Sequence, residues 1–211
     1  NMSNMSNMSN MSNRDYIVNI KNFPVQMTFM EKLEGTLEDL LEEDVYSEPI
    51  IKSMLFQIIF ALAYLQKHFK FTHNDLHINN IMYTTTEQKF LYYKQNNTYY
   101  KVPTYGKLAK IIDFGRAIFT LKNKVFFNDV FSKYGEAEGQ YTYPINYINY
   151  NIEKKKHNDK HYPNYSFDLC RLATTMIEYV YDNDINKKLY DMLNKIATDC
   201  NGENLNEYED S

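Results

Sequence analysis

Apolar residues recur at steps of three and four along four stretches of the chain, which is the spacing of one face of an α-helix. The longest stretch begins near Pro49, a residue that suits the first turn of a helix, and it predicts a buried helix of roughly 20 residues. Shorter helices are predicted over residues 36–41, 166–180 and 185–198. The apolar face of the long helix consists of Ile51, Leu55, Ile58, Ile59, Leu62 and Leu65.

The shorter helices also show end signals and apolar faces. Thr36 is a suitable N-cap followed by acidic residues in the first turn, and Ser166 is a suitable N-cap for the later helix. Their predicted apolar faces are Leu37, Leu40 and Leu41; Leu169, Leu172, Ala173, Met176, Ile177 and Val180; and Leu189, Met192, Leu193 and Ile196.

Short runs rich in β-branched and aromatic residues predict strands between these helices. Two of them, residues 16–20 and 25–30, precede the first helix and are separated by Asn22-Phe23-Pro24. Two more follow the long helix at residues 81–83 and 108–112. The pattern therefore predicts an α+β fold.

The segment between the last two strands, residues 84–107, predicts a β-hairpin. Tyrosine-rich runs at 90–93 and 98–102 flank Gln95-Asn96-Asn97, and asparagine is a favoured residue in hairpin turns. We therefore expect this segment to form an insertion with strands of its own.

Length and composition limit the class of protein. The chain has 211 residues, 44% of them hydrophobic and 16% aromatic, which predicts a folded core and not a disordered chain. Its net charge of −4 gives no general reason to expect nucleic-acid binding. We find no signal peptide, and no uninterrupted apolar run reaches the roughly 20 residues that span a bilayer.

The two cysteines, Cys170 and Cys200, have no metal-type spacing. Cys170 lies within the apolar pattern of a predicted helix, so we expect a buried, reduced thiol and a reducing compartment. At the chain ends, residues 1–13 repeat Asn-Met-Ser and residues 201–211 are acidic. We expect a low-complexity leader and a frayed tail there.

The strongest chemical signal lies in residues 71–82, where Asp75 and Asn80 stand five positions apart in a predicted loop between apolar flanks. A second signal follows at residues 110–115, where a β-branched run ends in Asp113-Phe114-Gly115. Each signal alone is moderately specific. Together they are specific, because the first signal follows a predicted helix and the second follows a predicted strand, in that order along the chain.

These two motifs resemble the catalytic loop and the metal-binding triplet of the protein kinase superfamily. The resemblance is closest to giant-virus (Mimivirus-like) Ser/Thr protein kinases. It rests also on the phrase Phe29-Met30-Glu31-Lys32-Leu33-Glu34-Gly35-Thr36-Leu37 and on the tyrosine-rich insertion, and it spans about residues 23–181.

The resemblance implies a kinase-like fold dominated by a mostly helical C-terminal lobe. Strands before the first helix would be a remnant of the N-terminal lobe. The implied organisation is a leader at 1–13, an N-lobe remnant and hinge at 14–35, a C-lobe at 36–200 and an acidic tail at 201–211.

The resemblance also implies ATP and Mg²⁺ as cofactors. Phosphoryl transfer needs metal ions that neutralise phosphate oxygens and a carboxylate that orients the attacking hydroxyl. Because Mg²⁺ takes hard oxygen ligands, Asp113 and Asn80 would hold the metal, and Asp75 would act as the base. Leu76 would anchor the loop, and Gly115 would let the backbone turn after the metal ligand.

His77 stands where Ser/Thr kinases usually have a lysine. It would be a second catalytic residue if its ring reached a phosphate oxygen, more strongly when protonated. A histidine at this place also occurs in small-molecule phosphotransferases. His73 and His77 have the spacing of a zinc pair, but without a glutamate base and in a loop this is a weak signal.

Adenine would be held by the strand and link that precede the first helix. By position, the carbonyl of Glu31 and the amide of Leu33 would bind the adenine edge. Met30 would lie at the back of the pocket and Met82 would form its floor. An ordinary strand, loop and helix connection is the alternative.

Several kinase features are missing. The six glycines, at positions 35, 106, 115, 135, 139 and 202, form no Gly-x-Gly loop. The only lysine before the predicted hinge is Lys21, and no helix is predicted to carry its glutamate partner. We therefore expect either part of a longer kinase, with a missing N-lobe segment as its partner, or a reduced and inactive one.

The later part of the chain also departs from the common kinase pattern. Residues 116–165 would be the activation segment, but they lack Ala-Pro-Glu. Because Asn74 replaces an arginine that pairs with phosphorylated segments, we expect no switching by phosphorylation. Residues 153–161 are basic and predict a solvated loop or a docking patch. Asp168 resembles the aspartate that holds the catalytic loop's backbone, with a helix-capping residue as the alternative.

Three functions remain open. The first is a viral-type Ser/Thr protein kinase that acts on protein substrates, in the cytoplasm of an infected host cell or packaged in a virion. The second is a pseudokinase or nucleotide-binding scaffold, and the third is a small-molecule phosphotransferase. None of them requires a nucleic acid or a membrane span.

Overall fold

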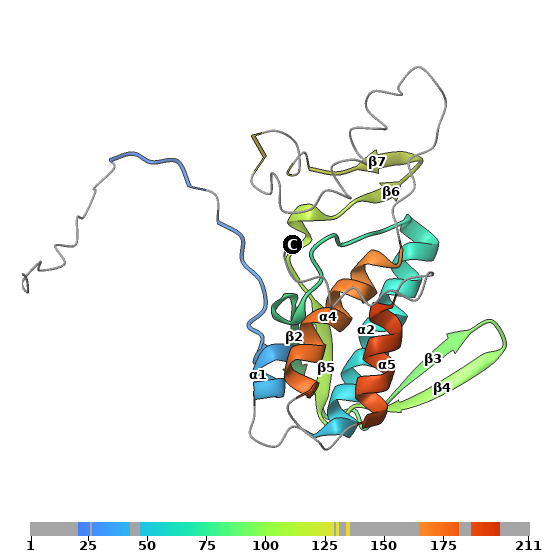
Figure 1. The fold of residues 1–211 in the computed structure, drawn as a ribbon. Helices are drawn as coiled ribbons and strands as arrows, with labels where there is room; N and C mark the ends of the chain where they lie inside the picture. The colour runs from blue at the N-terminus through green and yellow to red at the C-terminus, as the bar shows by residue number, and fades with distance from the viewer. Residues whose placement is uncertain are drawn as a thin grey trace, which may run out of the picture. The chain divides into compact units, whose positions relative to one another are not determined.

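The helices and strands among the described residues all lie in one of the chain's two units. The computed structural model describes residues 21–25, 27–42, 47–128, 130, 134–135, 165–181 and 187–198. Contacts between Cα atoms divide the chain into residues 1–32 and 33–211, and every helix and strand below lies in the second unit (Figure 1).

The described residues of the first unit form a turn and an irregular segment. The turn is at Lys21-Asn22, where Asn22 has a positive φ of 58°. The strand predicted over residues 25–30 is wrong for the residues that the structure describes, because they are irregular and exposed. A strand needs a neighbour for its backbone hydrogen bonds, and the strands of this structure pair with one another instead. The other predicted strand, 16–20, lies outside the described residues.

The first helix, α1 (Leu37–Glu42), starts with reciprocal capping by Thr36 and Asp39. The Asp39 N–H donates to Thr36 Oγ1 at 3.0 Å, and the Thr36 N–H donates to Asp39 Oδ2 at 2.6 Å. The Thr36 backbone bond holds the pKa of Asp39 below its usual value. Thr36 is therefore confirmed as the N-cap.

The long helix is confirmed as α2 (Glu48–Phe69), a helix of 22 residues with Pro49 in its first turn. Its C-cap is Lys70, which has a left-handed φ of 50° and donates its N–H to Gln66 O at 3.0 Å. By length and composition alone α2 could cross a membrane. Its apolar side is packed in the protein core, which favours a core helix. The buried apolar residues are Ile51, Met54, Leu55, Ile58 and Leu62.

A small antiparallel sheet lies against α2. Its order is β1 (Gly35–Thr36), β2 (Ile81–Thr85) and β5 (Lys107–Ile111), so the strands predicted at 81–83 and 108–112 are confirmed with ends that differ by at most two residues. The β2–β5 register pairs Ile81 with Ile111 and Met82 with Lys110. This register brings the end of the catalytic-loop motif beside the start of the Asp-Phe-Gly motif.

The side chain of Gln57 fastens α2 to β5. Its Oε1 accepts the Ala109 N–H at 2.9 Å, and its Nε2 donates to Lys107 O at 3.3 Å. Because Gln57 is buried, these bonds satisfy polar groups that would otherwise be costly to desolvate.

The predicted insertion is confirmed as a hairpin of β3 (Phe90–Gln95) and β4 (Thr98–Pro103), which projects beside α2 in Figure 1. Aromatic rings hold it there. Tyr93 lies 4.5 Å from Phe60 and 5.4 Å from Phe56, measured between ring centroids, and Tyr100 lies 5.5 Å from Phe56. Asn96 in the turn has a φ of 54°, which asparagine tolerates.

A second hairpin, β6 (Phe119–Leu121) and β7 (Lys124–Phe126), follows the Asp-Phe-Gly motif. The sequence interpretation missed it and described a segment of weak periodicity. The local signal was the Lys122-Asn123 pair, whose φ angles of 48° and 61° suit a tight hairpin turn. Most of the predicted activation segment, with the basic residues 153–161, lies outside the described residues.

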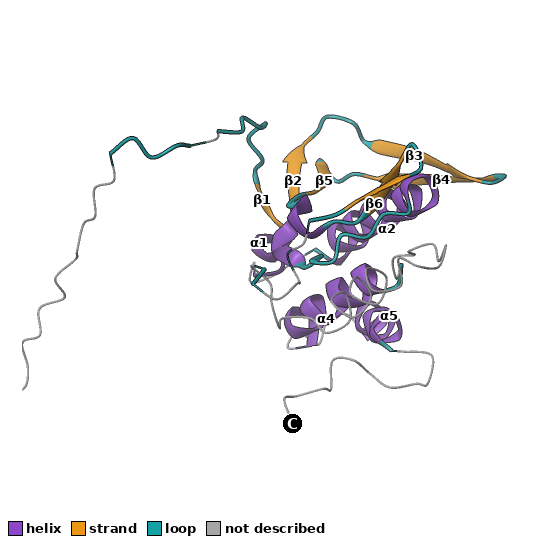
Figure 2. Cartoon of the chain, turned by 90° about the horizontal axis from the view of Figure 1, so that it is seen from above, coloured by secondary structure: helices purple, strands orange, loops and turns teal. Residues whose placement is uncertain are grey.

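Two packed helices, α4 (Phe167–Tyr181) and α5 (Lys187–Ala197), complete the core and confirm the last two predicted helices. Figure 2 shows the strands on one side of α2 and this pair on the other. Helices and separate antiparallel strands together confirm the α+β class. Cys170 on α4 is a free thiol, half-buried and not fully buried as predicted, and burial raises its pKa. The fully buried apolar residues of the pair are Leu172, Ala173, Met176, Leu189, Leu193 and Ala197.

Two neighbours on α5 test whether this helix is part of the core. The sequence pattern placed both Leu193 and Met192 on the apolar face, but Leu193 is 1% exposed and Met192 is 37% exposed. Leu193→Ala should lower the free energy of unfolding in urea by about 2–5 kcal/mol, because it leaves a cavity. Met192→Ala, the matched control, should cost less than about 1 kcal/mol. Equal losses would show that α5 does not pack as described.

Candidate active site

The carboxylate of Asp168 on α4 holds the loop between α2 and β2 in place. This side chain is fully buried, and it accepts the N–H of His73 at 2.7 Å and the N–H of Asn74 at 2.9 Å. Burial raises the pKa of Asp168, and the two backbone bonds oppose that rise. The prediction that Asp168 holds the loop's backbone is confirmed.

The same loop lies against the segment that follows the Asp-Phe-Gly motif. Thr72 and Ile118 exchange two backbone hydrogen bonds of 2.8 and 2.9 Å. Asn74 has a left-handed φ of 63°, and its Nδ2 donates to Arg116 O at 2.9 Å. Asn74 is therefore buried in a backbone contact, and it presents no cation for a phosphorylated segment.

His73 and Phe114 connect the two motifs through their rings. The His73 Nε2 lies 2.8 Å from the carbonyl of Ile112, which can only accept, so this nitrogen carries the proton. Phe114 lies 5.5 Å from His73 and 5.9 Å from Phe71, measured between ring centroids. These contacts place Phe114 against the catalytic-loop motif.

The sharp turn of the Asp-Phe-Gly motif occurs at Asp113 and not at Gly115, which corrects the sequence expectation. Asp113 has φ 58° and ψ 72°, whereas Gly115 has no positive φ. The Gly115 N–H donates to Asp113 Oδ1 at 3.3 Å, and a Cβ at Gly115 would lie 3.2 Å from the same oxygen. Glycine here therefore gives the carboxylate room.

Asn80, one of the two predicted metal ligands, links the other, Asp113, to the predicted base, Asp75. Its Nδ2 donates to the backbone carbonyl of Asp75 at 2.8 Å. The backbone carbonyl of Asn80 accepts the N–H of Ile112, the residue before Asp113, at 3.0 Å. The structure therefore brings Asp75, Asn80 and Asp113 to one region, with Asn80 between the other two.

The carboxylate of Asp75 is held by Arg116, a residue that sequence analysis did not select. Asp75 Oδ2 lies 3.3 Å from Arg116 Nη1, and both side chains are mostly buried. An arginine directly after the Asp-Phe-Gly motif was the available sequence signal. This ion pair limits the directions in which the Asp75 carboxylate can point.

The ring of His77 is engaged within the loop. Its Nε2 lies 3.0 Å from Asn80 Nδ2, and its Nδ1 lies 3.3 Å from the N–H of Asn79. Burial lowers the pKa of His77, which favours the neutral ring near pH 7. Its predicted contact with a phosphate stays a prediction. Leu76 beside it is fully buried, as expected of an anchor.

The structure gives no support to the zinc interpretation. The rings of His73 and His77 face different partners, Ile112 and Asn80. Within the part of the chain that the structure describes, no three His, Cys, Asp or Glu side chains form a metal-holding group.

The residues predicted to hold adenine fall in different parts of the chain. Met30 and Glu31 belong to the first unit, and half-buried Leu33 begins the second. Met82 is half-buried in β2, opposite Thr36 of β1. Their roles at the adenine stay predictions.

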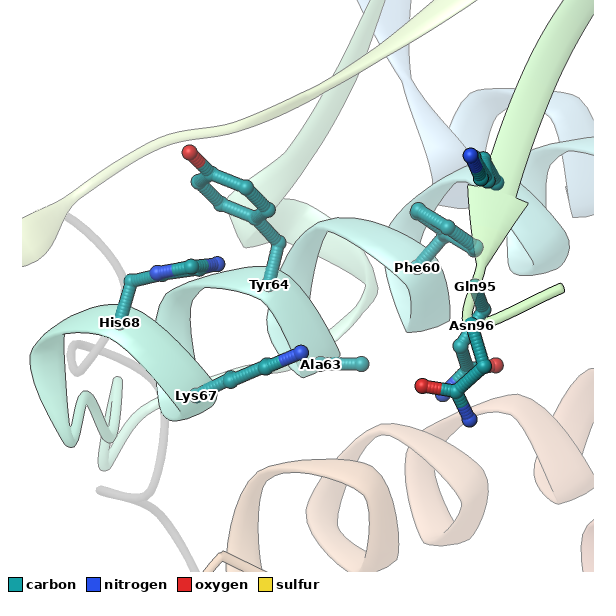
Figure 3. Close-up of a pocket in the computed structure, with 8 residues that line it drawn as sticks. Phe60, Ala63, Tyr64, Lys67, His68, Gln95 and Asn96 are labelled. Atoms are coloured by element: carbon teal, nitrogen blue, oxygen red, sulfur yellow. The ribbon is translucent and has the colours of Figure 1, made fainter.

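Two clefts lie elsewhere in the second unit. One of about 200 Å³ lies between the C-terminal half of α2 and the turn of the β3–β4 hairpin, with Tyr64, Lys67, His68 and Asn96 among its lining residues (Figure 3). The other, about 620 Å³, lies between the start of α2 and β4. Neither is lined by Asp75, Asn80 or Asp113, so the motif residues and their contacts define the candidate site.

Substitution of Asp168 tests the support of the loop. Asp168→Ala should lower the free energy of unfolding by roughly 2–5 kcal/mol, because it leaves two buried N–H groups without acceptors. Asp168→Asn should also destabilise, since its amide oxygen can accept only one of the two N–H groups and its NH₂ group would face the other. Glu178→Gln, on the exposed side of the same helix, is the control. Urea unfolding measures all three, and a stable Asp168→Ala variant would contradict the assignment.

Comparison with known proteins finds partial relatives that bear kinase names. No protein-family model matches the chain. It is 35% identical over 103 residues to a Dictyostelium discoideum protein named a probable serine/threonine-protein kinase, a match that covers 44% of this chain and 8% of that protein. It is 46% identical over 72 residues to a protein of Acanthamoeba polyphaga mimivirus with a serine/threonine-protein kinase name, covering 31% and 18% respectively.

A third match is the serine/threonine-protein kinase haspin of Mus musculus, 32% identical over 96 residues, which covers 44% of this chain and 13% of haspin. The matches thus span less than a fifth of the length of each of these three relatives. These partial matches show that this chain is related to proteins named as Ser/Thr protein kinases.

Proposed function

We propose that this chain carries the catalytic-loop part of a kinase that transfers phosphate from ATP, with Mg²⁺, to Ser/Thr hydroxyls of a protein substrate. The observation that carries the proposal is the position of Asn80. Its side chain binds the backbone of Asp75, and its backbone binds the residue before Asp113. One residue thus sets the spacing of the proposed base and the proposed metal ligand.

Asp75 is the group that would orient the attacking hydroxyl and accept its proton. A carboxylate does this only if it is held in one direction, and the ion pair with Arg116 at 3.3 Å supplies that restraint. The Asp168 bonds to His73 and Asn74 fix the backbone just before Asp75. The direction of the Asp75 carboxylate is therefore set both by the Arg116 ion pair and by the fixed backbone before it.

The side chains of Asn80 and Asp113 fit a magnesium ion. Mg²⁺ prefers oxygen ligands, commonly one or two from protein, and its other ligands come from phosphate and water. The Nδ2 of Asn80 is engaged by Asp75 and His77, so Oδ1 is the end of the amide available to a metal. Asp113 is exposed and adds a carboxylate. When bound, Mg²⁺ would neutralise charge on the transferred phosphate.

A phosphorylation assay tests the proposal. Phosphate incorporation into a Ser/Thr-containing protein substrate should fall at least about 100-fold in Asp75→Asn and in Asp113→Asn, because base and metal ligand each contribute to the transition state. Asp191→Asn, an exposed acid on α5, is the control and should match the parent chain. Equal incorporation by all four proteins would contradict the assigned roles.

One sequence observation favours a second candidate, a nucleotide-binding module without turnover. The chain has no Gly-x-Gly loop to cover the phosphates. A rise in melting temperature on adding ATP and Mg²⁺, without phosphate incorporation by the parent chain, would favour this candidate over the kinase.

A further inference from the structure

We propose that His77 is a positioning residue. Its ring Nε2 accepts a hydrogen bond from Asn80 Nδ2, and this bond holds the other end of the amide, Oδ1, toward the position proposed for the metal ion. The role of that amide as a metal ligand rests on the function proposed above. The orientation of the amide does not, because it follows from contacts within the loop.

The first step concerns which end of Asn80 is nitrogen. The terminal amide atom that lies 2.8 Å from the backbone carbonyl of Asp75 must be a donor, because a carbonyl oxygen can only accept. That atom is therefore Nδ2. If the amide were turned over, two oxygens would face each other inside a buried site, which is costly.

The second step concerns the other hydrogen of the same nitrogen. Nδ2 also lies 3.0 Å from Nε2 of His77, so its second hydrogen has an acceptor only if this ring nitrogen is unprotonated. The neutral ring then carries its proton on Nδ1. The N–H of Asn79 also points at Nδ1, at 3.3 Å, but a neutral ring accepts at only one of its two nitrogens, and we assign the acceptor to Nε2 because its contact is the shorter one.

With both hydrogens of Nδ2 engaged, the amide cannot rotate without losing two hydrogen bonds. Its oxygen, Oδ1, is held on the side away from Asp75 and His77. A lysine at position 77, as in most Ser/Thr kinases, offers only donors. It would set N–H groups against N–H groups and could not hold the amide in this way.

The alternative role for His77, a cation that contacts a phosphate, predicts the opposite effect of lysine. If His77 acted by charge, His77→Lys would preserve function. If it acts by accepting, His77→Gln should substitute better, because Gln Oε1 is an acceptor on a flexible stem. The pair of variants therefore separates positioning from charge.

The first readout uses the ligand-free protein and needs no activity. The Asn80 side-chain NH₂ signals, assigned by their loss in Asn80→Ala, should exchange slowly with water in the parent chain and in His77→Gln. In His77→Lys and His77→Ala, exchange should be at least about tenfold faster, the equivalent of one lost hydrogen bond. If one variant fails to fold, as judged by thermal melting, the remaining pair still decides.

The second readout is the Mg²⁺ concentration needed for half-maximal phosphate transfer at saturating ATP. His77→Lys should raise it about 10–100-fold, with a smaller change in kcat, since partners of metal ligands typically have that effect on metal affinity. His77→Gln should lie closer to the parent chain.

Slow NH₂ exchange in His77→Lys, or an unchanged Mg²⁺ requirement in that variant, would overturn the inference. If the parent chain shows no phosphate transfer, the proposed function fails, and NH₂ exchange alone still supports or overturns the role of His77.

Discussion

The structure around the candidate site depends on one buried carboxylate. Asp168 accepts the backbone N–H groups of His73 and Asn74, which lie 95 and 94 positions earlier in the chain. It joins α4, a helix of the core, to a loop whose other contacts come from the segment around the Asp-Phe-Gly motif. A buried carboxylate persists only if its oxygens are satisfied, so the fold and the loop geometry require each other.

The second constraint is Asn80, a small residue with contacts in three directions. Its side chain reaches Asp75 and His77, and its backbone carbonyl reaches Ile112. Antiparallel pairing of β2 with β5 then continues the alignment of the two motifs. The spacing of the proposed base, Asp75, and the proposed metal ligand, Asp113, would therefore be set by backbone and amide contacts of Asn80. These contacts take no part in the reaction themselves.

Sequence patterns predicted the parts of the fold whose causes are local. The helix α2, the capping of α1 by Thr36 and the β3–β4 hairpin each follow from side-chain periodicity or turn chemistry within a few residues. The strand predicted at residues 25–30 failed because a strand also needs a partner, which a local pattern does not show. On α5, Met192 was misassigned because the apolar stripe was broader than the buried one.

The candidate site was predictable in its residues and less so in its contacts. Asp75, Asn80 and Asp113 stand in recognisable motifs, whereas the Arg116 ion pair and the Asn80 bond to His77 depend on how distant segments meet. The left-handed turn fell on Asp113, although glycine two positions later was the residue expected to allow it. Backbone strain at an aspartate is paid for by tertiary contacts, and these are not visible in a single motif.

The most direct test of the central claim is paramagnetic broadening of assigned amide signals by Mn²⁺ in the presence of ADP. The account predicts that the signals of Asp75, Asn80 and Asp113 broaden together, while those in the turn of the β3–β4 hairpin at Asn96 stay sharp. If those three signals stayed sharp, or if only one of them broadened, the residues would not share a metal site, and the account would be contradicted.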